Sequence, residues 1–522
     1  MSWEDEVEGI ERRRLLAKSH GGDEAVAKHR ERGKQPLRER IDQLLDDGSF
    51  REVAPIAGNA ELDEQGAITG FTPANYVLGT GTVGGRTIAV GGEDFTIRGG
   101  SPGVGGLRKS VFAETLALRY RIPLVRLLEG GGGSVGGPAK GQARQPRPAG
   151  PDGLNNQARF HSIMRCMGEV PVASAAMGPV AGMPAARLAA SHFTVMVKGT
   201  SQVMIGGPAL VERAVGKTLT KEELGGHRVH LKSGVVHNLA DSEPDALAQI
   251  GRFFSYLPSH AWERPPVTEC DDPIDRAEPS LRAVVPRDRR KPYKMRTILD
   301  AVFDRGSFFE LRRRYGSSQI TGLARLAGQP VGVLANDPMF YAGAMTAAAA
   351  QKLGTFVDLC DNFHLPIVSL VDQPGFMIGP DAETTATIQY GTAAICAVMQ
   401  ARVPWLSVMV RKTYGVAGAA HYGAEATVLA WPSAEAGALP LEGGVAVAFR
   451  REIAEADDPE AKRAELEKLL AGRRNPYAAA ESCGVHDLID PAHTRRHLCE
   501  WLSLASPLLD AQLSPAQRTM RP

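Results

Sequence analysis

The fold of this chain is decided by residues 404–423, PWLSVMVRKTYGVAGAAHYG, and by an earlier echo, residues 171–182, PVASAAMGPVAG. Each stretch is an apolar run of six to eight residues that starts at a proline and stops where glycine and other small residues take over. This pattern predicts a buried strand that runs into a turn and then a helix. The first N–H groups of that helix have no acceptor within it, and they point at whatever lies in front. Two such ends that face one another would make two oxyanion sites.

Other strand patterns also occur twice, in the same order. Residues 81–90 match residues 324–333 at an offset of 324 − 81 = 243, and residues 122–129 match residues 365–372 at the same offset. The proline-led pair is offset by 404 − 171 = 233 residues, which a connection ten residues shorter explains. Three matched strands in one order predict two similarly folded halves. The alternative is a chance similarity between apolar strands.

A short motif repeats as well, because DDGSF at 46–50 and DRGSF at 304–308 each follow an apolar stripe at helical spacing. Such an ending is typical of a helix closed by glycine. Helical patterns occupy residues 111–119, 186–190, 209–215, 344–362, 386–400 and 452–474. Strand patterns that alternate with these helices predict α/β halves with helices packed on a central sheet. We expect domains at residues 1–265 and 275–522, joined through a proline-rich, charged linker within 259–292.

The composition excludes several classes of function. The chain has 522 residues with 60 basic and 59 acidic side chains, and no basic block is interleaved with aromatics as nucleic-acid binding requires. The charged start lacks the apolar core of a signal peptide, and no apolar run is long enough to span a membrane, so we expect a soluble, cytoplasmic protein. Six scattered cysteines form no CxxC pair and the histidines have no metal-ligand spacing, so neither a disulfide framework nor a metal is expected.

Glycine-bearing loops follow one matched strand in both halves. They are EGGGGS at 129–134 and PGFMIGP at 374–380. Neither is followed by the Gly-Lys-Ser/Thr of a P-loop, so a P-loop is rejected. The glycines at 131, 133 and 136 do fit GxGxxG spacing, but that spacing alone is a weak signal, and a dinucleotide site is rejected too. Adjacent glycines allow a ligand to approach the backbone closely. Paired loops predict a ligand site between the halves, and the alternatives are a flexible loop at 129–134 and a stiff structural turn at 374–380.

No side chain is an obvious nucleophile or base. GxSxG spacing occurs at 99–103 and 132–136, but only inside glycine runs, and the spacing alone does not make a nucleophile elbow. Ser174 and Ser407 lie inside apolar strands as core residues do. His421 lies close to the second glycine turn, where a hydrogen-bonded structural histidine is commoner than a catalyst. An enzyme that works through backbone dipoles and the chemistry of a cofactor would have such a sequence.

A series of ordered motifs resembles the carboxyltransferase (β) subunits of biotin-dependent acyl-CoA carboxylases, of the propionyl-CoA and methylcrotonyl-CoA carboxylase type, over nearly the whole chain. The motifs are GK at 33–34, RERID at 38–42, DGSF at 47–50, EDFT at 93–96, GGS at 99–101, GP at 178–179, AG at 181–182, TKEELGG at 220–226, SGV at 233–235, RKPY at 290–293, VD at 371–372, PGF at 374–376, RK at 411–412, YG at 414–415 and AWP at 430–432.

The resemblance implies a fold and an assembly. Each half would be a crotonase-like (ClpP/crotonase) ββα superhelix, and the subunits would form a homohexamer with active sites between the first half of one subunit and the second half of another. Biotin would arrive as carboxybiotin on a separate carrier, because this chain has no Ala-Met-Lys-Met biotinylation site. A biotin carboxylase and biotin carboxyl carrier α-subunit would then be the partner, an acyl-CoA the substrate, and no metal would be needed in this subunit.

The resemblance also implies the reaction. Carboxybiotin releases CO2, its ureido nitrogen takes the α-proton of the acyl-CoA, and the thioester enolate attacks CO2, so negative charge builds on two carbonyl oxygens. The family places oxyanion donors at Gly182 and Met183 in the first half, and at Val416 and Ala417 in the second. Each lost donor costs about 3 kcal/mol of transition-state stabilisation. The loops that line the cofactor site would be Gly130, Gly131, Gly132, Gly133, Pro374, Gly375, Phe376 and Gly415.

The sequence departs from the family at both turns. Many relatives have two glycines at each turn, whereas this chain has Gly182-Met183 and Gly415-Val416. The position that selects the acyl group, often aspartate in propionyl-type enzymes, is Ala419 here, and the loop that follows is about four residues shorter. A small apolar residue at this position predicts room for a longer or branched acyl chain.

Three other functions stay open. The same fold serves the carboxyltransferase subunit of a biotin-dependent acyl-CoA decarboxylase, which runs the reaction in reverse with membrane partners. The altered turns also allow a non-catalytic paralogue that binds acyl-CoA. A biotin-independent hydratase or hydrolase is disfavoured, since such enzymes usually need carboxylates at the turns, and neither turn supplies one.

Overall fold

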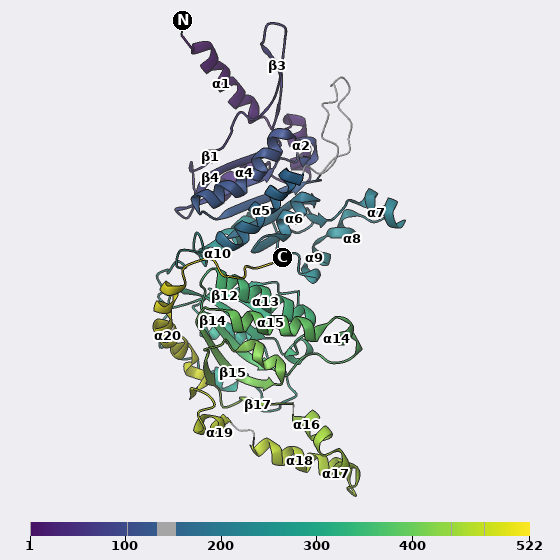
Figure 1. Ribbon diagram of the computed structural model, residues 1–522, viewed down its shortest axis with the longest axis vertical. Coiled ribbons are helices and arrows are strands. Elements are labelled where there is room, and N and C mark those ends of the chain that lie inside the picture. Colours follow the sequence, from purple (N-terminus) through teal and green to yellow (C-terminus); the bar gives the residue numbers. More distant parts are fainter. Residues whose placement is uncertain (1, 102, 133–152, 440, 474–475, 522) are drawn as a thin grey trace. The chain divides into compact units, whose positions relative to one another are not determined.

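The chain forms two compact units, unit 1 at Met1–Ala261 and unit 2 at Trp262–Met520. A computed structural model describes residues 2–101, 103–132, 153–439, 441–473 and 476–521, and these are drawn as ribbons in Figure 1. Each unit is an α/β structure built on its own sheet, and each is taken by itself below.

The sheet of unit 1 is mixed, with β1, β4 and β5 antiparallel and the later strands parallel. In spatial order its strands are β1 Arg51–Glu52, β4 Tyr76–Val83, β5 Arg86–Glu93, β6 Leu124–Gly130, β7 Val172–Ala181, β8 Phe193–Val197 and β10 Asn238–Ala240, with β9 Gln202–Met204 paired to the end of β7. A separate hairpin consists of β2 Gly58–Leu62 and β3 Ile68–Pro73.

The sheet of unit 2 repeats this order and these directions strand for strand. Its strands are β11 Phe309–Leu311, β12 Gln319–Leu326, β13 Gln329–Asn336, β14 Ile367–Gln373, β15 Trp405–Tyr414, β16 Thr427–Ala430 and β18 Asp487–Leu488, with β17 Glu435–Gly437 paired to the end of β15. The register repeats too, because Ala89 pairs with Leu124 and Gly332 pairs with Ile367, each 243 residues further along. The predicted duplication is confirmed.

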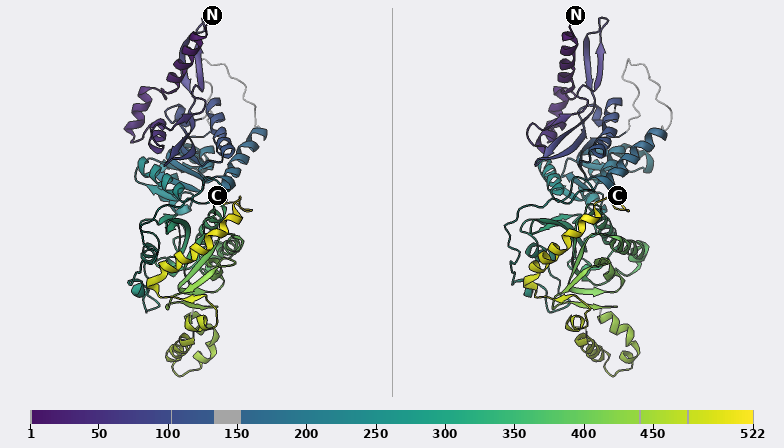
Figure 2. Two further views of the ribbon diagram at one scale, coloured as in Figure 1. Left: turned by 90° about the vertical axis from the view of Figure 1, so that its left-hand side faces the viewer. Right: turned by 60° about the vertical axis from the view of Figure 1, so that its left-hand side comes forward.

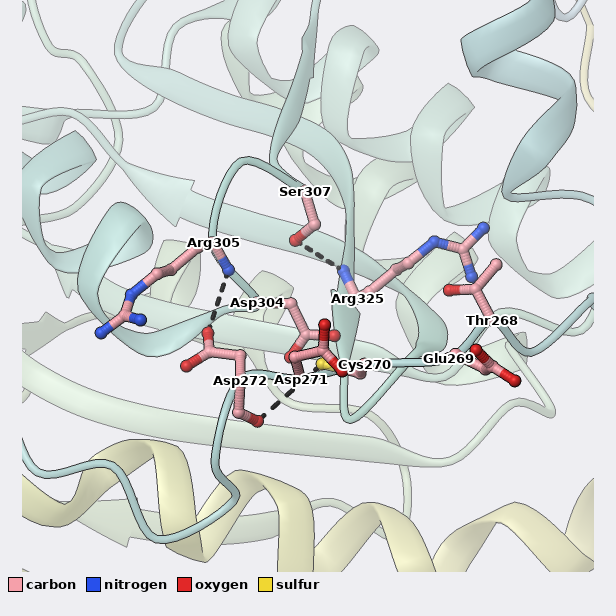
Figure 3. Close-up of a pocket in the computed structure, with 9 residues that line it drawn as sticks. All are labelled: Thr268, Glu269, Cys270, Asp271, Asp272, Asp304, Arg305, Ser307 and Arg325. Atoms are coloured by element: carbon pink, nitrogen blue, oxygen red, sulfur yellow. Dashed lines mark hydrogen bonds between the residues drawn. The ribbon is translucent and has the colours of Figure 1, made fainter.

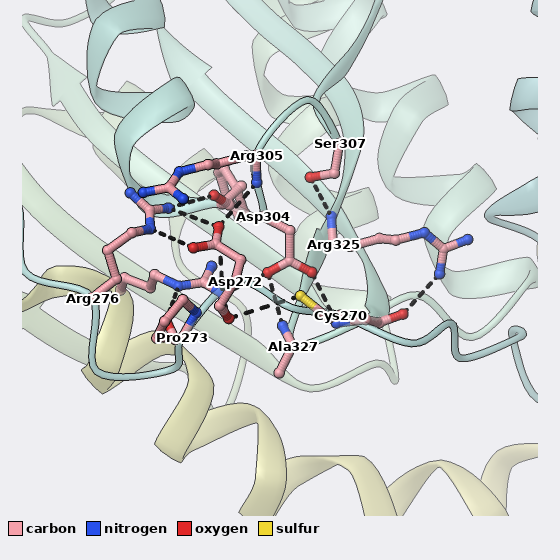
Figure 4. A network of polar contacts seen from close by, with 12 residues as sticks. Cys270, Asp272, Pro273, Arg276, Asp304, Arg305, Ser307, Arg325 and Ala327 are labelled. Atoms are coloured by element: carbon pink, nitrogen blue, oxygen red, sulfur yellow. Dashed lines mark hydrogen bonds and ion pairs between the residues drawn. The ribbon is translucent and has the colours of Figure 1, made fainter.

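The repeated Asp-x-Gly-Ser-Phe motif, residues 46–50 and 304–308, closes a hairpin turn in each unit. In unit 1, the Asp46 carboxylate accepts the N–H groups of Gly84 and Gly85, at 2.9 and 2.8 Å. In unit 2, the Asp304 carboxylate accepts the N–H groups of Ala327 and Gly328 at the same two distances, 2.9 and 2.8 Å (Figure 4). The motif therefore fastens the preceding helix to the β4–β5 or β12–β13 turn.

The phenylalanine that ends the motif explains why a buried glycine is needed in β4 and in β12. A Cβ on Gly79 would lie 2.4 Å from the Phe50 ring, and a Cβ on Gly322 would lie 2.6 Å from the Phe308 ring. Since real Cβ atoms do not approach other atoms so closely, only glycine lets these rings lie flat on the strand. Both glycines occupy one position of the repeat, 243 residues apart.

Helices cover both faces of the sheet of unit 1. Ala113 and Leu116 of α4, with Cys166 of α5, pack on Leu78 and Leu124 of the sheet. On the other face the ring of Phe253 in α10 stacks on Phe193 of β8, with ring centroids 5.0 Å apart. The helices of unit 1 are α1 Glu4–Ala17, α2 Asp23–Glu31, α3 Leu37–Leu44, η1 Arg98–Gly100, α4 Val104–Tyr120, α5 Gly153–Glu169, α6 Met183–Ala189, α7 Pro208–Val215, α8 Lys221–Gly225, α9 His227–Ser233 and α10 Glu243–Ser255.

Unit 2 is layered in the same way. Helix α13 lies so close to β13 that a Cβ on Gly332 would be 2.4 Å from Cys360 Sγ. On the opposite face Leu498 and Leu502 of α20 join the main core, and Figure 2 shows α20 in yellow across the sheet. The helices are α11 Leu281–Val284, α12 Met295–Val302, η2 Tyr341–Gly343, α13 Ala347–Asn362, α14 Pro380–Thr384, α15 Thr387–Gln400, η3 Val416–His421, α16 Leu441–Ala448, α17 Arg450–Ala454, α18 Pro459–Arg473, α19 Pro476–Glu481, η4 Pro491–His493, α20 Thr494–Ala505 and η5 Ser506–Gln512.

The helix predicted after the second turn is present as a short 3₁₀ helix, η3. One other local prediction needs correction. The charged helix predicted at 452–474 is two helices, α17 and α18. Asp458 accepts the N–H groups of Glu460 and Ala461, at 3.1 and 3.0 Å, and so starts a new helix in which Pro459 occupies the first position.

Candidate functional site

The first turn follows the fully buried strand β7 and is built on one glycine. Gly182 has φ 65° and ψ −128°, a conformation open to glycine and costly for other residues, and it is exposed to solvent. Helix α6 begins at the next residue, Met183, and Pro184 follows inside its first turn. Because Pro184 has no N–H, the groups without a helical acceptor at this turn are the N–H groups of Gly182, Met183 and Ala185, and the first two are the positions predicted from the sequence.

The glycine loop after β6 lies against this first turn. A Cβ on Gly132 would be 2.8 Å from the Ala181 carbonyl oxygen, and a Cβ on Gly182 would be 3.4 Å from Gly132 Cα. Gly130 is buried and Gly131 exposed, whereas Gly133 lies outside the described residues. The fold therefore brings the loop and the turn together, and glycine is what permits their close approach.

The second turn has the same backbone shape. Gly415 follows β15 with φ 63° and ψ −163°, and it too is exposed. Its N–H donates to the carbonyl oxygen of Gly437 in β17, at 3.1 Å, so it is not available to a ligand. The next donors along the chain are Val416, whose side chain is 64% exposed, and Ala417, which is buried. These are the predicted donors of the second half.

The loop after β14 is held in place by backbone and side-chain hydrogen bonds. Gly375, with φ 127°, donates its N–H to Gln373 Oε1 at 3.0 Å and accepts the N–H of Met345 at 3.0 Å. The half-buried Phe376 ring packs on Gly391 of α15, where a Cβ would lie 2.2 Å from it. Pro374, Gly375 and Phe376 thus form a rigid loop, and the predicted selecting residue Ala419 lies half-buried within η3.

A buried ionic network anchors the first turn. Glu114 Oε1 in α4 accepts from Arg187 Nε in α6 at 3.0 Å and from Arg126 Nη2 in β6 at 3.1 Å. Arg126 Nη1 also donates to the carbonyl oxygens of Arg187 and Ala190, at 3.1 and 3.0 Å. All three charged side chains are at most 3% exposed. The arginine on the central strand therefore holds the helix that begins at Met183.

A second buried carboxyl group, Glu93, lies beside this turn. Its Oε2 accepts the N–H of Glu129 at 3.3 Å, and its Cγ would be 3.4 Å from a Cβ on Gly130. Burial raises the pKa of Glu93 to about 7, although the charge of Arg187 works in the opposite direction. Glu93 thus changes charge near neutral pH.

A neutral network anchors the second turn. His421, the last residue of η3, is completely buried, and its Nδ1 lies 3.0 Å from Ser369 Oγ in β14. Its Nε2 lies 3.3 Å from Asn336 Nδ2 and 3.4 Å from Gln373 Nε2. The sequence analysis treated His421 as a structural residue, and its contacts agree with that interpretation.

The contacts of the two amides determine the tautomer of His421. Asn336 Oδ1 accepts the N–H of Asp372 at 2.9 Å, and Gln373 Oε1 accepts the N–H of Gly375 at 3.0 Å, so both amide nitrogens face the imidazole. Nε2 is therefore an acceptor, and Nδ1 carries the proton and donates to Ser369. Burial lowers the pKa of His421 to about 3, which keeps the ring neutral at ordinary pH.

A buried carboxylate also lies near the end of the central strand of each unit, β6 or β14. Glu129, with no exposed surface, accepts from Lys34 Nζ at 2.6 Å and from Arg40 Nη1 at 2.7 Å. Arg40 in turn binds Glu243 of α10 at 2.7 Å. Helix α3 is thereby fixed to the end of β6. The sequence analysis did not name these partners, because ion pairs between distant segments leave no local pattern.

Asp372 occupies the equivalent position in unit 2 but has different partners. Its carboxylate accepts from the Tyr293 hydroxyl at 3.0 Å, from Arg411 Nη2 at 3.1 Å and from the N–H of Lys412 at 3.1 Å. The Arg411 guanidinium lies 4.9 Å from the centre of the Tyr293 ring. The offset of 243 between Glu129 and Asp372 was the one signal in the sequence that pointed to both acids.

A pocket in unit 2 lies apart from these turns. It is lined by segment 268–272, by the loop between α12 and β11, and by one residue of β12. The lining residues are Thr268, Glu269, Cys270, Asp271, Asp272, Asp304, Arg305, Ser307 and Arg325, drawn in Figure 3. Asp272 is paired with Arg276 at 2.7 Å and Asp304 with Arg495 at 2.8 Å, within the network of Figure 4. Across the described ranges no group of His, Cys, Asp and Glu could hold a metal ion. Asp272 and Asp304 thus serve as ion-pair partners within unit 2.

Comparison with known proteins gives a family. Residues 28–512 match the carboxyl transferase domain family. The chain is 35% identical to a propionyl-CoA carboxylase carboxyltransferase subunit of Haloferax mediterranei, over 95% of each chain. It is 32% identical to the methylmalonyl-CoA decarboxylase subunit alpha of Veillonella parvula, over 94% of each chain. No described helix is long and apolar enough to cross a membrane.

A solved structure shares the fold throughout. It is transcarboxylase 12S, described as a hexamer assembly with methylmalonyl-coenzyme A and methylmalonic acid bound. Its chain superposes with a TM-score of 0.87 at 32% identity, and the match covers 100% of this chain and 97% of that one. The tandem crotonase-like fold expected from the sequence is thereby confirmed.

Proposed function

The chain belongs to the carboxyl transferase family, and from this premise we propose that it moves a carboxyl group between carboxybiotin, held on a separate carrier, and the α-carbon of an acyl-CoA. Its family and relatives make it an acyl-CoA carboxyltransferase. The observation that carries the proposal is the pair of turns, in which an exposed glycine at the end of a buried strand leads into a helix in each unit.

The two turns match the two charges that this reaction creates. When bound, carboxybiotin supplies CO2 and a ureido nitrogen that accepts the α-proton. The chain then has to stabilise oxyanions on the ureido and thioester carbonyl groups, and backbone N–H groups do this without titrating. We assign these roles to Gly182 and Met183 in one site, and to Val416 and Ala417 in the other. The loops at 130–133 and 374–376, with Gly415, would line the bound groups.

The acyl group is proposed from Ala419. The relatives named above act on propionyl-CoA or methylmalonyl-CoA. A half-buried alanine in η3 leaves space where a carboxylate would limit the pocket, so we propose a longer or branched acyl chain. Values of kcat/KM measured over a series of acyl-CoA substrates test this: a preference for propionyl-CoA over all longer chains would contradict it.

The direction of transfer has two candidates. Carboxylation is the main proposal, and decarboxylation is the second, because a decarboxylase subunit is among the relatives at 32% identity. Both directions use the same oxyanion sites, since the transfer step is reversible. We also propose that the chain works as a homohexamer, as described for transcarboxylase 12S, with a biotin carrier subunit as its partner.

The test is the reverse transfer with free biotin. Purified chain is mixed with biotin and methylmalonyl-CoA or malonyl-CoA, and the biotin-dependent loss of the carboxyl group is followed. Val416→Pro removes one donor and should lower kcat at least a hundredfold, because one oxyanion donor is worth about 10²–10³ in rate. Val416→Ala keeps the N–H and should retain activity within a few fold. Acyl-CoA binding without any turnover would favour a non-catalytic paralogue.

A further inference from the structure

An exposed basic segment lies beside the second turn. Residues 287–294, RDRRKPYK, carry five cations and one acid, and four of the cations, Arg287, Arg290, Lys291 and Lys294, are exposed. Within the described part of the chain, none of these four lies in an ion pair, whereas Arg289 is paired with Glu435. Four unpaired cations in eight residues make a strong local positive potential in a chain with a net charge of only +1.

The segment is held rigidly against the strand that leads to Gly415. Arg411 Nη1 donates to the Lys291 carbonyl oxygen at 3.0 Å, and the Tyr293 hydroxyl donates to the buried Asp372 at 3.0 Å. Because these bonds use a backbone carbonyl and a tyrosine, they leave the charged heads of the cations in solvent.

A second attachment fixes the other end of the segment. Arg289 Nε donates to Glu435 Oε1 at 2.7 Å, and Glu435 Oε2 accepts the hydroxyl of Tyr414, also at 2.7 Å. Tyr414 immediately precedes Gly415, so the cations are anchored next to the turn through two contacts. A merely solvated charge run would need no such attachment to the end of β15.

The positions of the charges favour a protein partner over a small anion. Small phosphate groups are usually held by converging N–H donors at a glycine turn or a helix start. Here the four cations are distributed over the bends and turn at 287–290 and the irregular stretch 291–294, and all four are exposed, so a protein face can meet them at several points. The chain carries no biotin attachment sequence of its own, so the proposed reaction requires a carrier to reach this surface at every turnover.

We infer that the basic segment 287–294 is the docking surface for the biotin carrier, and that the carrier meets it with an acidic face. The inference rests on the proposed function. Complementary charge would raise the rate of encounter and fix the orientation of the carrier over the second turn, and both effects weaken as salt rises. Free biotin has no acidic face and would gain nothing from the segment.

The experiment compares a biotinylated carrier domain of an acyl-CoA carboxylase with free biotin as the acceptor. The variant is Arg287→Glu, Arg290→Glu, Lys291→Glu and Lys294→Glu together. We expect kcat/KM for the carrier to fall at least tenfold at low salt, and the salt dependence seen with the unmodified chain to disappear. With free biotin, kcat/KM should stay within twofold. A matched control reverses Arg213, Lys217, Lys221 and Lys232, which are exposed cations of unit 1, and should leave both reactions unchanged.

Other outcomes overturn the inference. An equal loss with free biotin would mean that the segment shapes the site itself, and a rise in KM for the acyl-CoA alone would mean that it binds the phosphates of CoA. No change with the carrier would mean a solvated surface. Equilibrium binding of the same carrier domain, followed by fluorescence anisotropy over a salt series, separates this inference from the proposed function. Charge-dependent binding without turnover would support the docking surface and contradict the reaction.

Discussion

The turn at Gly182 and the turn at Gly415 have similar backbone shapes and are held by different chemistry. Their φ values are 65° and 63°, and each follows a buried strand. The first is anchored by the ionic network of Arg126, Glu114 and Arg187, and the second by the neutral imidazole of His421. The difference teaches that the duplicated feature is the backbone turn, while the side chains that support it have diverged.

Equivalent positions make the divergence plain. Arg126 and Ser369 are 243 residues apart on the central strands, and each reaches the helix that follows the turn, one through ion pairs and carbonyl groups and the other through His421. Glu93 and Asn336 are also 243 residues apart. Each accepts the N–H of the acid that ends the central strand, at 3.3 and 2.9 Å. One geometry is thus maintained by a carboxyl group in unit 1 and by an amide in unit 2.

The largest expected effect comes from breaking the ionic anchor. Glu114→Gln removes the carboxylate that forms the ion pairs with Arg126 and Arg187, and breaking a buried ion network in this way costs about 3–5 kcal/mol. Urea unfolding with hydrogen exchange over unit 1 measures it. Glu500→Gln, which removes an exposed pair with Arg496, is the control and should leave the unfolding midpoint unchanged. A loss below about 1 kcal/mol would show that the network is not the anchor.

The next effect depends on pH. It is tested by replacing Glu93 with an amide, the group that Asn336 supplies at the equivalent position of unit 2. The pKa of Glu93 is about 7, against 4.5 ordinarily, so folding favours its protonated form. The contribution of Glu93 to stability is therefore fully present below about pH 4.5 and is lost as pH rises towards 7, by about 3 kcal/mol in all.

Glu93→Gln should remove this loss. The variant keeps an acceptor for the N–H of Glu129, so it should be more stable than the parent at pH 8 by up to about 3 kcal/mol and equal to it at pH 4.5. Chemical denaturation at a series of pH values makes the comparison. Equal stability of the two proteins at pH 8 would mean that Glu93 is not destabilised by burial.

A smaller effect is expected from the neutral anchor. His421→Leu removes the acceptor for the amide nitrogen of Gln373, and an unsatisfied buried donor costs about 1–2 kcal/mol. Asn336 Nδ2 keeps Gln319 Oε1 and the Gly343 carbonyl oxygen as acceptors, each at 3.4 Å. His421→Gln restores a polar partner and should recover most of that loss. Thermal unfolding of the two variants measures the difference. A loss from His421→Leu as large as that from Glu114→Gln would contradict the distinction between the two anchors.

The smallest effect should be the same in both units. Ser49 Oγ accepts the N–H of Thr82 and Ser307 Oγ accepts the N–H of Arg325, each at 3.1 Å. Ser49→Ala and Ser307→Ala should therefore each cost about 1 kcal/mol. Denaturation curves for the two variants test whether the Asp-x-Gly-Ser-Phe motif contributes equally to the stability of both halves. Losses of unfolding free energy that differ by more than about 1 kcal/mol would refute an equal contribution.

Much of the fold could be predicted because its signals are local or periodic. Prolines before strands and glycines after them predicted β7, β15 and both turns. The constant offset between matched strands predicted the duplication. The prediction was wrong at 452–474, where the Asp458 cap starts a second helix. The oxyanion roles of Gly182, Met183, Val416 and Ala417 remain predictions, although both turns have the expected exposed glycine.

The sequence by itself determined that this chain is a duplicated α/β protein with a glycine turn after one buried strand in each half. Only the tertiary structure decided how each turn is held, through Glu114 in one unit and His421 in the other, and that Gly437 takes up the N–H of Gly415. The physical reason is range. Strand, turn and helix propensities act over a few neighbouring residues, whereas buried ion pairs and hydrogen bonds join segments tens of residues apart and leave no periodic pattern in the sequence.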